Sequence, residues 1–169
     1  MNQIIQSLMD RKSVRSFTSQ EIPENIVQEI LEASAQAPTA GNQQLYTILR
    51  ISDPEKKRRL SISCDNQPFI KEAKLVLVYC ADCLKWYRAF EQAGCEPRKP
   101  GEGDLMLAVC DAVIAAQNAV VAAESLGIGS CYIGDIMENC EEQRDILGLS
   151  PYVFPAGRIT IDFGESPRF

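Results

Sequence analysis

The sequence contains no histidine among its 169 residues. This absence excludes Ser-His-Asp and Cys-His catalysis in their usual forms, zinc sites with imidazole ligands, and any imidazole proton shuttle. Positive charge is also scarce, because 17 Lys and Arg against 23 Asp and Glu give a net charge of −6. This balance argues against nucleic acid or an anionic membrane surface as a partner, but it leaves room for a local basic pocket.

A regular cysteine framework is lacking as well. The seven cysteines are scattered at positions 64, 80, 83, 95, 110, 131 and 140. Cys80-Ala-Asp-Cys83 has the spacing of metal and redox sites, but a four-ligand site needs two more cysteines nearby. We therefore favour small buried residues at a strand end over a redox or metal pair. The amphipathic segment 1–10 does not have the pattern of a signal peptide, so we expect free thiols and a reducing cytoplasm.

No apolar run is long and uninterrupted enough to span a membrane. The most apolar stretch, 108–123, contains Asp111, Gln117 and Asn118, which would be costly in lipid. We find no internal repeat and no low-complexity tract. The segments on either side of the Gly- and Pro-rich stretch 94–103 are each too small to fold alone. The sequence therefore predicts one domain, 1–169, without a membrane span.

Hydrophobic periodicity predicts helices that alternate with single strands. Helices are expected at 1–10, 23–36, 53–62, 84–92, about 104–126 and 139–147, and strands at 45–51, 75–81, 130–133 and 158–163. The helix near 104–126 is apolar on most faces, so we expect it to be buried, either at the centre of the fold or between subunits. Gly127 is expected to end it in the left-handed conformation. This order of elements predicts a central sheet covered by helices.

A basic segment follows directly on the first predicted helix. It runs Arg11-Lys12-Ser13-Val14-Arg15, and an extended backbone would place Arg11, Ser13 and Arg15 on one side. Two guanidinium groups and a hydroxyl on one face can clamp a phosphate, because arginine gives bidentate, charge-assisted hydrogen bonds. A solvated basic stripe at a helix end explains the same residues equally well.

Two further stretches could accept a flat ligand. Residues 37–44 combine turn formers, small side chains and amides able to read a heterocyclic ring edge, although a plain helix-to-strand loop is the favoured interpretation. Gln117 and Asn118 need partners on an apolar helix, and the glycine-rich turn 127–134 after it would let a ring lie against the backbone. Its Gly-x-Gly is not a Rossmann fingerprint, because it follows a helix and lacks the third glycine.

Four stretches, in this order and spacing, resemble the FMN-dependent nitroreductase family. They read RKSVRSF at 11–17, APTAGNQQ at 37–44, DAVIAAQNAVVAAESLGIGSCYIG at 111–134, and PAGRITIDFGESP at 155–167. The resemblance covers nearly the whole chain. It implies an α+β fold, a three-layer sandwich whose central sheet is mixed, mainly antiparallel, and flanked by helices. It also implies a homodimer in which both subunits build each FMN site.

The resemblance further implies which residues bind FMN. The expected ligands of the phosphate and ribityl chain are Arg11, Lys12, Ser13 and Arg15. The expected contacts from the loop that one subunit lays against the other's flavin are Pro38, Thr39 and Asn42. The expected neighbours of the ring are Asn66 at its pyrimidine side and Ile133 and Gly134 near N5, and Arg168 is expected to close over the phosphate.

The implied activity is that of an FMN-dependent oxidoreductase. NAD(P)H would reduce FMN, and a nitroaromatic, quinone or related small molecule would then accept the electrons in a ping-pong cycle. Such a cycle needs no catalytic side chain and no metal, which agrees with the absence of histidine.

Two departures from the family motivate a second hypothesis, a non-catalytic FMN carrier or sensor. Where many members read Gln-Pro-Trp, this chain has Gln44-Leu45-Tyr46. Members also usually continue well past the stretch that matches 163–167, whereas this sequence ends at Phe169. The stretch 84–103 is the candidate lid over the flavin.

Overall fold

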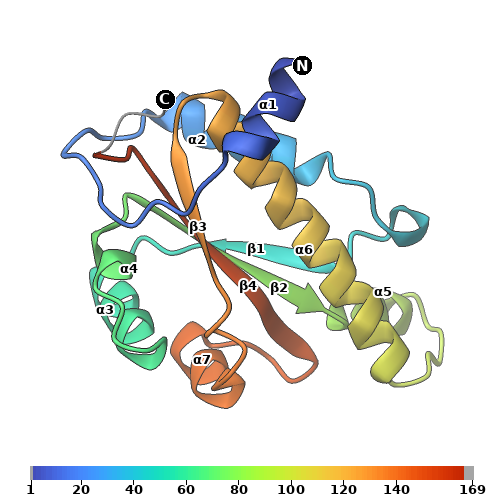
Figure 1. Ribbon diagram of the computed structural model, residues 1–169. Coiled ribbons are helices and arrows are strands. Elements are labelled where there is room, and N and C mark those ends of the chain that lie inside the picture. The colour runs from blue at the N-terminus through green and yellow to red at the C-terminus, as the bar shows by residue number, and fades with distance from the viewer. Residues whose placement is uncertain (1, 166–169) are drawn as a thin grey trace.

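The computed structural model describes residues 2–165, so Arg168 lies outside the described residues (Figure 1). The helices are α1 (Gln3–Asp10), α2 (Glu24–Ala35), α3 (Pro54–Ser63), α4 (Phe69–Glu72), α5 (Leu84–Gln92), α6 (Glu102–Ser125) and α7 (Cys140–Leu147), with a short 3-10 helix at Ala40–Asn42. The strands are β1 (Tyr46–Arg50), β2 (Leu75–Asp82), β3 (Gly129–Ile133) and β4 (Val153–Asp162). Every expected helix and strand is present. The structure adds α4 and the 3-10 helix, and β4 begins at Val153 instead of 158.

The four strands form one sheet in the order β1-β2-β4-β3, and all three neighbouring pairs are antiparallel. The long strands β2 and β4 lie at its centre. A parallel pairing occurs outside these strands, as an isolated bridge between Ser13 and Ser130. The predicted α+β sandwich is therefore confirmed, with a sheet whose strands are antiparallel throughout.

Helices cover both faces of the sheet. One buried cluster lies between the sheet and α2 and α6, and a second lies between the sheet and α3, α4 and α7. We call these the α6 side and the α3 side. Side chains of a strand alternate between its faces, so Ile159 and Ile161 of β4 belong to the first cluster, whereas Val76 and Val78 of β2 belong to the second. The molecule therefore has three layers.

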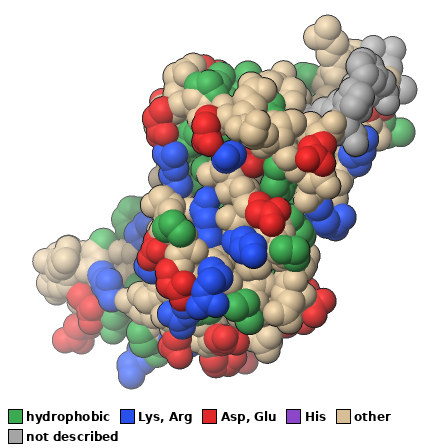
Figure 2. Space-filling view, turned by 90° about the vertical axis from the view of Figure 1, so that its left-hand side faces the viewer, with side chains coloured by type: hydrophobic (Ala, Val, Ile, Leu, Met, Phe, Trp, Pro, Cys, Tyr) green, Lys and Arg blue, Asp and Glu red, His purple; other side chains and the backbone are tan. Residues whose placement is uncertain are grey.

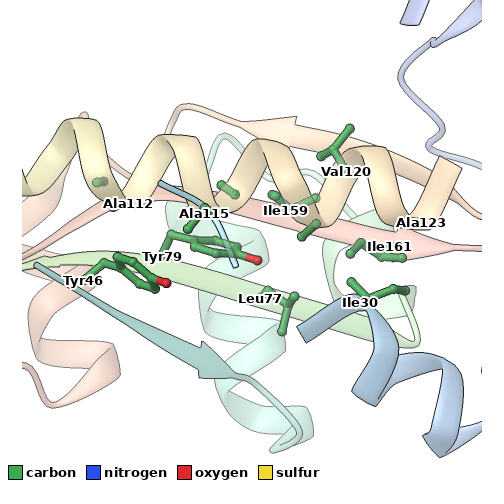
Figure 3. Close-up of a cluster of buried hydrophobic side chains, with 14 of the residues drawn as sticks. Ile30, Tyr46, Leu77, Tyr79, Ala112, Ala115, Val120, Ala123, Ile159 and Ile161 are labelled. Carbon is green, nitrogen blue, oxygen red and sulfur yellow. The ribbon is translucent and has the colours of Figure 1, made fainter. Parts of the chain in front are cut away.

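The long helix α6 lies at the centre of the first cluster (Figure 3). Its side chains that face the sheet are small, and the buried ones include Ala108, Ala112, Ala115, Ala116, Ala119 and Ala123. Small side chains let the helix approach the sheet closely. Gly127 follows with φ of +76°, which confirms the expected left-handed end. Within residues 2–165, α6 alone is long and apolar enough to cross a bilayer, but its packed face is that of a core helix.

All seven cysteines are free thiols, and they lie within the described part of the chain. Cys80 is buried in β2, where burial raises the pKa of its thiol to about 12, and Cys83 is half-buried just after the strand. A thiol with so high a pKa is unreactive, because the thiolate is the nucleophile. No group of metal-ligating side chains occurs among residues 2–165. These findings agree with the interpretation of the C-x-x-C spacing as small residues at a strand end.

Candidate functional site

The basic segment runs as a non-helical stretch beside β3. The backbone N–H of Val14 donates to the carbonyl of Ser130 at 3.0 Å, which joins the segment to the start of that strand. Lys12, Ser13 and Arg15 are exposed and line one pocket of about 240 Å³. Two cations and a hydroxyl around a small pocket provide the donors that a phosphate group requires. The structure thus brings these three predicted phosphate ligands together.

Arg11 lies at the end of α1, half-buried and close to Tyr132 of β3. Its Nη1 is buried and has no hydrogen-bond partner among residues 2–165. Burial raises the pKa of the Tyr132 hydroxyl to about 12, and the charge of Arg11 acts in the opposite direction. A buried donor without a partner is uncommon in native proteins, so this guanidinium has unused capacity for a ligand.

The predicted ring neighbours meet at the end of β3. Asn66 is exposed, and both it and Asp65 adopt positive φ, +52° and +59°, which Asn and Asp tolerate better than other residues. The side-chain amide of the next residue, Gln67, donates to Asp135 Oδ2 at 2.6 Å. This bond joins the Asn66 loop to the stretch that contains buried Ile133 and exposed Gly134.

A contact between aromatic and cationic side chains links the two parts of this surface. The guanidinium of Arg15 lies 5.9 Å from the centre of the Phe69 ring, within the range of a cation–π interaction. Phe69 begins α4, directly after the Asn66 loop. The basic segment, the Asn66 loop and the end of β3 therefore form one continuous surface, which we call the candidate flavin surface.

The predicted loop 37–44 lies apart from this surface and projects to the right in Figure 1. Pro38 and Asn42 are exposed, Thr39 is half-buried, and Asn42 has φ of +55°. Within one chain the structure does not bring these three residues together with the candidate flavin surface. This placement is the one expected if the loop serves the flavin of a second subunit.

Three side chains hold the loop in place. The carboxylate of buried Asp111 accepts the backbone N–H of Ala40 at 3.1 Å and of Leu45 at 3.2 Å. Trp86 Nε1 donates to the Gln43 carbonyl at 2.7 Å. Lys85 Nζ donates to two backbone carbonyls nearby, at 2.9 and 2.6 Å. The loop is therefore anchored to α5 and α6, while Pro38 and Asn42 stay exposed.

Several residues of the region were not expected from the sequence. The hydrogen bond between Gln67 and Asp135 joins the Asn66 loop to the stretch after β3, and the Phe69 ring makes a cation–π contact with Arg15. Of these, only Gln67 had a local signal, because it follows the predicted Asn66. The amides on α6 did find partners, since Asn118 Nδ2 donates to the Ala33 carbonyl at 3.1 Å and Gln117 accepts the Tyr132 hydroxyl at 3.3 Å.

The side of the molecule where α3 and α4 lie carries side chains of both charges. Figure 2 views the side that lies at the left in Figure 1, where α3 and α4 are found, and it shows Lys and Arg mixed with Asp and Glu. Helix α3 contains four consecutive basic residues, Lys56, Lys57, Arg58 and Arg59.

A family model described as Nitroreductase family matches residues 8–161. The chain belongs to the nitroreductase family. It is 34% identical over 175 residues to an FMN reductase (NADPH) of Bacillus subtilis strain 168, with 99% of this chain and 70% of that protein covered. A second member from the same organism, named FMN reductase with NAD(P)H as donor, is 34% identical over 163 residues, with 95% and 66% covered.

Solved structures of nitroreductases agree with this assignment. A nitroreductase of B. subtilis superposes with a TM-score of 0.92 at 31% identity, covering 96% of this chain and 67% of that one. The NADPH:FMN oxidoreductase of Vibrio harveyi complexed with NAD⁺ gives a TM-score of 0.89 at 26% identity, with 98% and 70% covered. The chain thus spans about two thirds of the length of these relatives, between 66% and 70%. The expected family and fold are confirmed, and the relatives' names agree with the expected oxidoreductase activity, FMN and NAD(P)H.

Proposed function

We propose that this chain binds FMN on the candidate flavin surface and uses NAD(P)H to reduce small acceptors such as nitroaromatics or quinones. The observation that carries this proposal is the continuity of that surface. Three stretches far apart in the sequence meet there through the Gln67–Asp135 hydrogen bond and the Arg15–Phe69 contact. Bound FMN supplies the hydride and electron chemistry, and the chain's own residues bind it, orient it and set its electrostatic surroundings.

The residues of the surface fit the chemistry of FMN. Lys12, Ser13 and Arg15 would hold the phosphate in their pocket, and Arg11 Nη1 is a further unused donor. At Gly134 a Cβ atom would meet no other atom within 4 Å, so its backbone borders open space where a flat ring can approach. No acid or base side chain is needed in these roles, which agrees with the lack of histidine.

Absorbance and anaerobic reduction test the proposal. Purified protein should be yellow and should bleach with NADH or NADPH. Arg11→Ala should weaken FMN binding by about 1.5–3 kcal/mol, the range for a hydrogen bond to a charged group. An exposed-site control, Arg59→Ala, should bind FMN normally. A colourless protein that takes up no added FMN would refute the proposal. Bound FMN with a rate of NAD(P)H oxidation no higher than that of free flavin would favour the carrier or sensor.

We also propose that the chain forms a homodimer through α1 and the outer face of α6, which contact each other. The structure buries no residue of α1. The large apolar side chains exposed on these two helices are Ile4, Ile5, Leu8, Met9, Leu105, Met106, Leu107, Val113 and Ile114. Many exposed apolar side chains on two helices that contact each other are typical of an interaction site, and a second copy would supply the loop 37–44 that the candidate flavin surface lacks.

Sedimentation tests the dimer. Val113→Arg places a charge on the proposed interface and should give a monomer with unchanged far-ultraviolet circular dichroism. Asp145→Arg, at an exposed position of α7, is the matched control and should stay dimeric. A Val113→Arg dimer of wild-type stability would refute this interface.

The seven free thiols support the expected cytoplasmic location, because an oxidising compartment would favour disulfides.

A further inference from the structure

Arg158 is a fully buried cation in the middle of β4. Its Cα pairs with Val78 of β2 and with Ile133 of β3, so its side chain lies on the α3 side among apolar residues. Its Nη1 donates to the Leu60 carbonyl at 3.4 Å, near the end of α3. Its Nε and Nη2 are buried and have no partner within residues 2–165. Such an arrangement is costly, because burial strips water from the charged guanidinium and the hydrogen bonds of the protein replace only part of that lost hydration.

The charge of Arg158 is also poorly neutralised. Burial lowers the pKa of its guanidinium, while Cys64, Asp135 and Cys131 act in the opposite direction, and an arginine stays protonated in proteins. Asp135 is the one carboxylate among these neighbours, but its Oδ2 accepts the Gln67 amide at 2.6 Å. No ion pair joins Asp135 to Arg158 in the described part of the chain. The guanidinium charge therefore lies inside the α3 side without a directly bonded counter-ion, and the Asp135 carboxylate acts on it only through space.

This charge lies directly behind the candidate flavin surface. Ile133, its partner in β3, comes just before Gly134. Leu60, which accepts its hydrogen bond, and Cys64, which lies near it, come just before the Asn66 loop. The two stretches that would border the flavin ring are thus the two that Arg158 contacts or pairs with. The surrounding apolar cluster screens a charge weakly, so its field extends to this surface.

We propose that Arg158 stabilises the reduced, anionic form of FMN through its buried charge, without touching the cofactor. The inference rests on the proposed function, because it requires FMN on the candidate flavin surface. Hydride transfer moves two electrons and one proton from NAD(P)H to FMN, so NAD(P)H becomes NAD(P)⁺ and the reduced flavin anion gains one negative charge. A fixed positive charge favours that state over oxidised FMN and raises the reduction potential. The alternative is a structural role, in which Arg158 only caps the end of α3.

Neutral and charge-conserving variants separate the two roles. Arg158→Met and Arg158→Gln remove the charge, and Arg158→Lys keeps it. The neighbouring Thr160→Val changes the same cluster without changing charge, and Arg59→Met removes a cation from the exposed part of α3. For each protein, the dissociation constants of oxidised and reduced FMN, the midpoint potential and the melting temperature of the apoprotein are measured.

The neutral variants should bind reduced FMN more weakly relative to oxidised FMN by about tenfold, the scale of one charge acting through a partly screened interior. Their midpoint potentials should fall accordingly, while Arg158→Lys and both controls should keep the wild-type ratio. The apoprotein of Arg158→Met should melt no lower than wild type, because a buried unpaired charge has been replaced by an apolar group of similar length.

The other outcomes distinguish a failure of the proposed function from a failure of the inference about Arg158. If wild type binds no FMN, the proposed function fails and this inference falls with it. If wild type binds FMN and the neutral variants keep its potential, the inference alone is overturned. If both neutral variants fail to fold, or melt lower with an unchanged ratio of affinities, Arg158 is a structural cap and the inference is likewise overturned.

Discussion

The two halves of the sheet differ in how their buried polar groups are partnered. In the half formed by β1 and β2, the Tyr79 hydroxyl is 3.0 Å from the Ser34 hydroxyl, and Asp111 accepts two backbone N–H groups beside β1. In the half formed by β3 and β4, buried polar atoms of Ser130, Arg158 and Thr160 have no partner among residues 2–165.

The position of the unpartnered atoms indicates what each half does. Buried polar atoms without partners are costly and uncommon, and among residues 2–165 all of them except Arg144 Nε belong to the basic segment, β3 or β4. Ser130 adjoins the basic segment, and Arg158 pairs with Ile133. Within residues 2–165, the buried side-chain polar atoms of β1 and β2 all have partners, whereas the half with β3 and β4 keeps polar groups that the fold alone does not need.

Truncation of apolar residues is expected to cost the same in both halves, and it is the largest effect we predict. Leu77→Ala in β2 and Ile159→Ala in β4 each remove a fully buried side chain from the α6 side. Each should lower the free energy of unfolding by about 2–5 kcal/mol, from lost burial and the cavity left behind. Urea unfolding monitored by circular dichroism measures both. If Ile159→Ala lowered the free energy of unfolding much less than Leu77→Ala, the two halves would also differ in packing.

Removal of a buried charge should have opposite consequences in the two halves. Asp111→Asn loses an acceptor for the N–H groups of Ala40 and Leu45 and should destabilise the protein by about 1.5–3 kcal/mol. Arg158→Met should cost nothing or stabilise, since its charge is largely unpaired. Urea midpoints of the two variants give the comparison. Equal destabilisation by both would remove the distinction between the halves.

The sequence predicted the fold well because amphipathic helices such as α1 and α5, and the continuous apolar strand β2, leave clear local patterns. The exceptions have local causes. The start of β4 contains Pro155 and Gly157, which disfavour strands, and pairing with β2 overrides them. The four-residue α4 is too short to show a helical period.

The site was predictable only in pieces. The resemblance identified the three stretches, but the contacts that join them, such as Gln67 to Asp135, connect residues far apart in the sequence. Arg158 could not have been found in this way. In the alternating run from Arg158 to Asp162, polar residues suggest a solvent-facing side, and only the helices of the α3 side bury it.

Loss of one hydroxyl in each half provides a smaller and more specific test. Tyr79→Phe breaks the contact with Ser34 and should destabilise by about 1 kcal/mol. Thr160→Val replaces a buried hydroxyl that has no partner within residues 2–165 and should be neutral or stabilising by up to about 1 kcal/mol. The melting temperature should therefore fall in Tyr79→Phe and stay equal or rise in Thr160→Val. A destabilised Thr160→Val would mean that this hydroxyl is satisfied in solution.

The smallest effect concerns an exposed arginine that does have a partner. Arg98 donates to Asp104 at the start of α6, with an Nη2–Oδ1 distance of 2.8 Å, and ties down the candidate lid 84–103. Its hydrogen bond, aided by the backbone N–H of Gly101, lowers the pKa of the Asp104 carboxyl to about 2. The lowered pKa means that the pair stabilises the fold above the ordinary aspartate pKa and that this contribution is lost as the pH falls through about 2.

Because the pair is exposed and screened by solvent, it should contribute less to stability than any of the changes above. In Arg98→Met the Asp104 carboxyl should titrate close to its ordinary pKa of 3.8, as followed by carbon NMR. The stability difference from wild type should vanish in acid. An unchanged titration would show that Gly101 alone holds the carboxylate. If the shift occurs, an exposed arginine with a full ion pair contributes little to stability, whereas buried Arg158 without one is retained at a cost that the fold by itself does not explain.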